Sequence, residues 1–128
     1  MIPTTTRAEA ATAALNGCWN AIEACLGGVR LPDDALPHLA LRIANTAINF
    51  GGEEGIVSVD DTLSPAALDI VATHGRNRGR LVPAIFERAG GMLRICCDLS
   101  GTSRPRRFTA PAGSRLLLVT YRRVAKRR

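Results

Sequence analysis

The stretch GIVSVDDTLSPAALDIVATHGRNRGRLVPAIFERAGGMLRICCDL (residues 55–99) predicts a β-meander. It contains four short apolar segments, separated by DTLSP, HGRNRG and AGG, at residues 55–60, 67–73, 81–88 and 92–99. Runs of this length that are rich in Val, Ile and Leu and bounded by Gly, Pro, Asn and Asp are typical of strands joined by turns. Pro83 has no N–H for a ladder, so its strand is expected either to begin after it or to have a free edge there.

The strand pattern continues on both sides of this stretch. Four further strands are expected at residues 19–26, 39–44, 46–50 and 114–123, the last of which contains RLLLVTYRR. A helix is expected at residues 7–15, where Thr6 and Glu9 have the spacing of a capping box, and one helical turn is expected to begin at Asp33 or Asp34. Eight short strands without long intervening helices predict an all-β barrel or sandwich.

The composition predicts one domain whose core is built from small side chains. A chain of 128 residues can bury about two thirds of the surface that its unfolded form exposes. With only three Phe, one Trp and one Tyr, the interior must be filled mainly by Ala, Leu, Val and Ile. In a barrel, such a core can leave space for a small ligand. The cysteines, which we expect to be free thiols, are Cys18, Cys25, Cys96 and Cys97.

The net charge of +6 hides an asymmetry along the chain. Residues 1–73 carry three arginines and nine carboxylates, whereas residues 74–128 carry fourteen Lys or Arg and two carboxylates. A basic surface would attract phosphate, nucleic acid or an acidic protein, although few aromatic side chains are present to stack on bases. The opposite signs of the two halves also permit self-association. The basic groups expected to meet at one rim are Arg76, Arg78 and Arg80 in a turn, Arg104, Arg106 and Arg107 in the loop GTSRPRRFTAPAG, and residues 122–128.

No catalytic or metal-binding pattern stands out in the sequence. His38 and His74, the two imidazoles, lie in a Pro-rich connection and in a turn, with no nucleophile at a recognisable motif spacing. The paired carboxylates at 33–34, 53–54 and 60–61 are adjacent, so they would point apart on an extended chain. We therefore expect a non-enzymatic protein with no catalytic residue, no metal site and no cofactor.

The hydropathy pattern predicts no membrane insertion, because no apolar run approaches the roughly eighteen residues that a membrane helix needs. The N-terminus MIPTTTRAEAATAALNG lacks the basic and apolar regions of a signal peptide. A cytoplasmic location is expected for the sequence as given, and an exported form stays open if a leader was removed.

Three stretches resemble a family of bacterial hypothetical proteins with a small lipocalin-like domain. They are LNGCWNAIEACLGGVRLPDDAL at 15–36, GIVSVDDTLSPAALDIVATHGRNRGRLVPAIFERAGGMLRICC at 55–97, and RPRRFTAPAGSRLLLVTYRR at 104–123. The resemblance implies a lipocalin-like barrel over residues 15–123, for which the strand pattern predicts eight antiparallel strands. A helical extension at 1–14 and a basic tail at 124–128 lie beyond this domain and depart from the family's usual pattern. In lipocalin-like barrels a Gly-x-Trp opens the first strand, and an arginine of the last strand covers the Trp. Here these residues would be Gly17 and Trp19, with Arg122 or Arg123.

Two functional hypotheses follow from these patterns. In the first, the barrel binds a small apolar or amphipathic ligand, because its lightly aromatic interior can leave space. In the second, the barrel is a scaffold and its arginine-rich loops bind an acidic partner, as an inhibitor or immunity-type protein would. Whether the interior is hollow separates the two.

Overall fold

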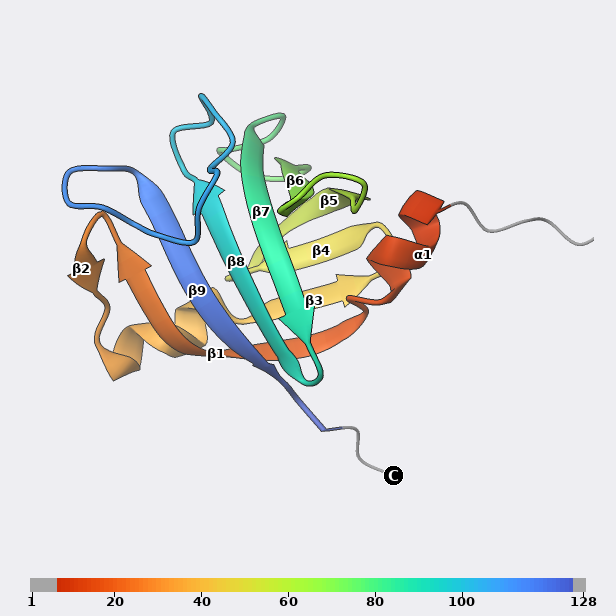
Figure 1. Cartoon of the computed structure of the whole chain (residues 1–128), viewed down its shortest axis with the longest axis horizontal. Helices are drawn as coiled ribbons and strands as arrows, with labels where there is room; N and C mark the ends of the chain where they lie inside the picture. The colour runs from red at the N-terminus through yellow and green to blue at the C-terminus, as the bar shows by residue number, and fades with distance from the viewer. Residues whose placement is uncertain (1–6, 126–128) are drawn as a thin grey trace, which may run out of the picture.

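The computed structural model describes residues 7–125, with side chains described from residue 10 onward. These residues form a closed antiparallel β-barrel preceded by a short helix (Figure 1). The ring contains eight strands: β1 (Gly17–Leu26), β3 (Leu41–Ala44), β4 (Ala47–Phe50), β5 (Glu53–Asp60), β6 (Ala66–Ala72), β7 (Leu81–Ala89), β8 (Met92–Asp98) and β9 (Leu116–Arg123). Each strand pairs with the next one in sequence around the ring, and β9 pairs with β1 to close it. The predicted eight-stranded antiparallel barrel is therefore confirmed.

Three elements lie outside the ring. The helix α1 (Arg7–Ala13) precedes β1. The 3₁₀-helix η1 (Asp33–Leu39) begins at Asp33, one of the two expected starts. The strand β2 (Val29–Arg30) pairs only with the end of β1. The sequence did not predict β2, because two residues between a Gly pair and a Pro are too short to show a strand pattern. The expected helix at 7–15 ends at Ala13, and the expected Thr6–Glu9 cap lies outside the described residues.

The strands alternate between a buried inner face and an outer face, as antiparallel sheets with one covered side do. In β5, Val57 and Val59 are buried whereas Ile56 and Ser58 are exposed. The turn between β3 and β4 contains Asn45 at φ 59°, a left-handed conformation that Asn tolerates better than most residues. Because this alternation fixes the register, the predicted strand positions agree with the structure to within about two residues at most ends.

The barrel has two different ends. The helix end is formed by α1 and by the short β3–β4, β5–β6 and β7–β8 turns (Figure 1). The loop end is formed by the β4–β5 turn, residues 73–80 and the long loop 99–115. This loop returns over the outer side of the sheet, because Phe108 and Thr109 contact Arg94 and Cys96 of β8. Any opening into the barrel must therefore be sought at one of these two ends.

Pro83 lies inside β7, which begins two residues earlier at Leu81. The alternative that the strand begins after Pro83 is therefore wrong. On one side Pro83 is in register with Asp69 of β6, whereas on the other side pairing with β8 begins only at Ala84. Pro83 is thus beyond the end of the β7–β8 ladder, where its missing N–H removes no hydrogen bond from that ladder.

Candidate functional site

The helix end of the barrel is closed by Trp19 and Arg123. The Trp19 side chain is fully buried, and its indole N–H donates to the carbonyl of Leu15 at 2.9 Å. The Arg123 guanidinium lies 4.3 Å from the centre of the indole ring and donates to the carbonyls of Asn16 at 2.7 Å and Ala14 at 3.1 Å. These carbonyls follow α1, where helix-end carbonyls lack partners of their own. The same arginine therefore covers the Trp and ties the helical segment to the ring.

Of the two arginines that the sequence left as alternatives, Arg123 takes this place and Arg122 is exposed. Arg123 is in register with Trp19 across the β1–β9 pair. Gly17 has φ +133°, a backbone conformation that residues with a side chain rarely adopt. Backbone geometry therefore favours glycine at the first position of the Gly-x-Trp, whereas a Cβ there would make only ordinary contact, 3.4 Å from the Arg123 guanidinium.

The barrel interior next to this end is packed rather than hollow. Tyr121 is buried, and its hydroxyl donates to the carbonyl of Leu39, at the end of η1, at 2.9 Å. The Cys97 thiol is also buried, and burial raises its pKa to about 12, so it stays protonated. The other large side chains that fill this region are Leu15, Ile43, Val57, Leu68, Leu93 and Val119. A ligand cannot enter from the helix end without unfolding this packing.

A cavity of about 260 Å³ lies at the loop end. Its apolar lining is formed by Phe50, Ile70, Ala72, Val82 and Leu99, which come from β4, β6, β7 and the residue that follows β8. This volume is just below the roughly 300 Å³ at which pockets for small molecules usually begin. The hollow part of the barrel is therefore a shallow mouth rather than a deep lumen.

Charged side chains stand at the rim of this mouth. Arg80 and Arg115 line it from the starts of β7 and β9, and Glu53 and Glu54 line it from β5. The carboxylates have partners, since Glu53 accepts a hydrogen bond of 2.8 Å from Asn77 and Glu54 lies 3.2 Å from the ring of His74. Arg80 donates to the carbonyl of Leu99 at 3.1 Å. Within the described part of the chain, no hydrogen bond or ion pair engages the Arg115 guanidinium.

The basic groups do not meet at one rim, contrary to expectation. Arg76, Arg78 and Arg80 belong to the loop end, whereas Arg122 and Arg123 end β9 at the helix end. The third group, Arg104, Arg106 and Arg107, lies in the loop that covers the outer side of the sheet. The reason is the barrel's meander, because the β6–β7 turn and the end of β9 are at opposite ends of an antiparallel ring.

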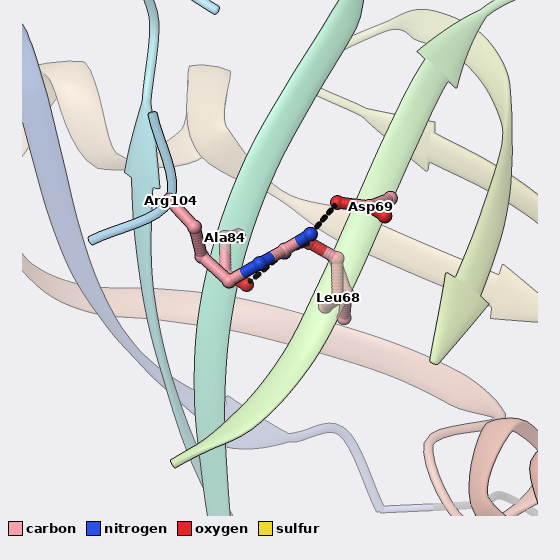
Figure 2. Close-up of polar contacts among 4 residues, drawn as sticks. All are labelled: Leu68, Asp69, Ala84 and Arg104. Carbon is pink, nitrogen blue, oxygen red and sulfur yellow. Dashed lines mark hydrogen bonds and ion pairs between the residues drawn. The ribbon is translucent and has the colours of Figure 1, made fainter. Parts of the chain in front are cut away.

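Arg104 is part of the fold and not a free surface group (Figure 2). It forms an ion pair of 2.8 Å with Asp69 and donates to the carbonyls of Ala84 at 2.9 Å and Leu68 at 3.4 Å. Leu68 and Ala84 are partners in the β6–β7 register, so the guanidinium bridges the two strands from the outside. Arg106 and Arg107 are exposed and are the members of this group open to a partner.

Asp98 organises the start of the long loop. Its buried carboxylate accepts hydrogen bonds from Ser100 and Thr102, each through backbone N–H and hydroxyl, and from the backbone N–H of Ser103. Desolvation by burial raises the Asp98 pKa, but the hydrogen bonds from Ser100, Ser103 and Thr102 outweigh it and lower the pKa to about 2. The loop is thereby fixed beside the mouth, to which the intervening Leu99 contributes.

The remaining reactive side chains do not form a second centre. Burial raises the pKa of the Cys96 thiol, which donates to the Thr109 carbonyl beneath the loop. His74 and Glu54 form an exposed pair, with the Thr73 hydroxyl 2.9 Å from the ring. Among residues 7–125, no group of three or more His, Cys, Asp or Glu side chains is arranged to hold a metal ion.

The mouth residues, apart from Arg80, were not recognisable as a site in the sequence. Phe50, Val82 and Leu99 are apolar residues in or next to strands, like many others in this chain. They line the mouth only because their side chains point inward at the loop end. The sequence did contain a partial signal for the lining. Ala84 and Phe86 of β7 point into the core, so by strand alternation Val82 and Arg80 continue the same inner face toward the loop end. Arg115 could have been found in the same way, two residues before the buried Leu117.

No protein-family model matches this chain, and neither the curated proteins nor the solved structures compared with it give a match. In the described residues, none of the helices has the length and apolar character needed to cross a membrane.

Proposed function

We propose that this protein is a non-enzymatic, lipocalin-like binding protein that takes a small ligand with an apolar part into the mouth at the loop end. The observation that carries the proposal is the cavity of about 260 Å³, with an apolar lining and a polar rim. A few polar groups around an apolar lining are typical of sites for small molecules. The closed helix end supports this reading, because the packing around Trp19 gives the barrel a rigid base.

The proposal is tested by filling the mouth. Ala72→Leu adds bulk to the lining, and we expect it to weaken binding of octan-1-ol by at least about tenfold, because the added side chain occupies the ligand's volume. Binding is followed by amide chemical shifts in NMR titration, with shifts expected around Phe50, Val82 and Leu99. Ala89→Leu, at an exposed position of the helix end, is the matched control. Absence of octanol binding by the unmodified protein, or shifts confined to other surfaces, would contradict the proposal.

The second candidate function is recognition of an acidic protein partner through the long loop. Arg106 and Arg107 favour it, because both are exposed. Arg106 also borders an open groove formed with Leu63 and Pro65 of the β5–β6 turn. Here Arg104 is unsuitable as a probe, because reversing its charge would break the contacts to Asp69 and to two strand carbonyls.

The double variant Arg106→Glu with Arg107→Glu tests this candidate without disturbing Arg104. If the loop captures an acidic partner, we expect the variant to lose capture from lysate at low salt and the unmodified protein to lose it as salt rises. A matched charge reversal, Arg122→Glu at the helix end, should leave capture unchanged. Equal capture by all three proteins at low salt would rule out the loop.

A further inference from the structure

We propose that the ligand of the mouth carries an anionic head group, a carboxylate or a phosphate ester, which Arg115 and Arg80 bind at the rim while its apolar part rests on the lining. This inference rests on the proposed function, since it assigns the chemical class of the ligand to the same site. Arg80 and Arg115 line the mouth together with Phe50, Ile70, Val82 and Leu99.

Arg115 supplies the strongest support. It precedes β9 by one residue and lines the mouth, and its guanidinium has no hydrogen bond or ion pair within the described residues. A guanidinium offers five N–H donors in a planar fork that matches a carboxylate or a phosphate. An unengaged arginine beside an apolar cavity is therefore a preformed site for the charged end of an amphipathic anion.

Arg80 adds a second donor set from another strand. One of its terminal nitrogens donates to the carbonyl of Leu99, itself a lining residue, and this bond holds the side chain at the rim. The single bond leaves other N–H donors of the same guanidinium for a ligand. Arg76 and Arg78 in the adjoining turn are exposed and add positive potential at the same end.

Glu53 and Glu54 also line the mouth, and their negative charges oppose the attraction of an anion by the arginines. Glu53 is engaged by Asn77 and Glu54 by His74, so each carboxylate already has a protein partner. Arg80 and Arg115 line the mouth together with these two carboxylates, and Arg76 and Arg78 lie in the adjoining turn. The positive charges at this end outnumber the two carboxylates, which favours an anionic ligand. Glu53→Gln should tighten binding of the anion, because it removes a charge repulsion.

A head-group series measures this preference directly. Octanoate, octan-1-ol and octylamine share one apolar chain and differ in the charge of the head at pH 7. We expect octanoate to bind the unmodified protein about fivefold more tightly than octanol, which corresponds to one exposed charge pair. Octylammonium should bind most weakly, and the preference for octanoate should shrink as salt rises.

The variants assign the preference to residues. Arg80→Gln with Arg115→Gln should remove the preference for octanoate, so that octanoate and octanol bind this double variant with about equal affinity. Arg122→Gln, an exposed arginine of the helix end, should change neither. Equal affinities for octanoate and octanol in the unmodified protein, or an octanoate preference that survives the double variant, would overturn the inference while leaving the proposed function intact. Binding of none of the three compounds would instead overturn the proposed function itself.

Discussion

Trp19→Ala should lower the free energy of unfolding by about 4 kcal/mol, the largest effect we expect from one substitution in this chain. The indole is fully buried between the ring and the segment after α1. Its removal leaves a cavity at the helix end, an unpaired Leu15 carbonyl and a guanidinium with no ring beneath it. Urea denaturation followed by circular dichroism measures the loss.

Two further variants divide this effect into its parts. Trp19→Phe keeps a ring under Arg123 but loses the N–H bond to Leu15, so we expect a smaller loss of about 1–2 kcal/mol. Arg122→Ala, next to Arg123 but exposed, should change stability by no more than about 0.5 kcal/mol. A loss below about 1 kcal/mol for Trp19→Ala would show that the helix end does not depend on the indole.

Asp98→Ala is the second large effect, with an expected loss of about 3 kcal/mol. The substitution leaves the backbone N–H groups of Ser100, Thr102 and Ser103 without their acceptor. The loop 99–115 should then detach from the sheet more often, because its first turn is no longer fixed. The Cys96 thiol reports this detachment, since it lies buried against the Thr109 carbonyl of the same loop.

We therefore expect faster labelling of Cys96 by a thiol reagent in Asp98→Ala than in the unmodified protein. Asn49→Ala is the matched control, because the Asn49 side chain accepts a hydrogen bond of 2.9 Å from the backbone N–H of Gly52 in the exposed β4–β5 turn. It should cost about 0.5 kcal/mol and leave the labelling rate unchanged. Unchanged labelling in Asp98→Ala would mean that other contacts, such as those of Arg104, hold the loop without the carboxylate.

The same carboxylate makes stability depend on pH in acid. Its pKa is about 2 in the folded protein and 3.8 in a model peptide, so its contribution is complete above about pH 4 and is lost as pH falls toward 2. The shift corresponds to about 2 kcal/mol. The difference in unfolding free energy between the unmodified protein and Asp98→Asn should narrow by this amount between pH 5 and pH 2. A constant difference would contradict the assigned pKa.

Much of the fold could be predicted from the sequence, because strands and turns have local signals. The apolar alternation and the Gly-rich turns placed all eight ring strands within two residues at each end. The strand β2 and the early end of α1 were missed, because two residues carry no period and Leu15 leaves the helix to enter the core. The sequence also left open whether Pro83 lies inside its strand. The structure decides this, because the pairing of β7 with β8 stops at Ala84, before it reaches Pro83.

The candidate site was much less predictable than the fold. The arginine groups were visible in the sequence, but the expectation that they share one rim was wrong. In the sequence, Arg104 cannot be distinguished from Arg106 and Arg107. In the structure, however, it forms an ion pair with Asp69 and donates hydrogen bonds to two strand carbonyls. A sequence shows that a side chain is charged, whereas its partners come from segments that are distant along the chain.

The sequence by itself determined the strand pattern and the charge asymmetry of this protein, because side-chain alternation, turn residues and charge are properties of neighbouring residues. Only the tertiary structure decided that Arg123, and not Arg122, covers Trp19, and that the interior is packed at that end and open at the other. The physical reason is ring closure, since the pairing of β9 with β1 fixes which face of each strand points inward and how much volume the inward side chains must fill.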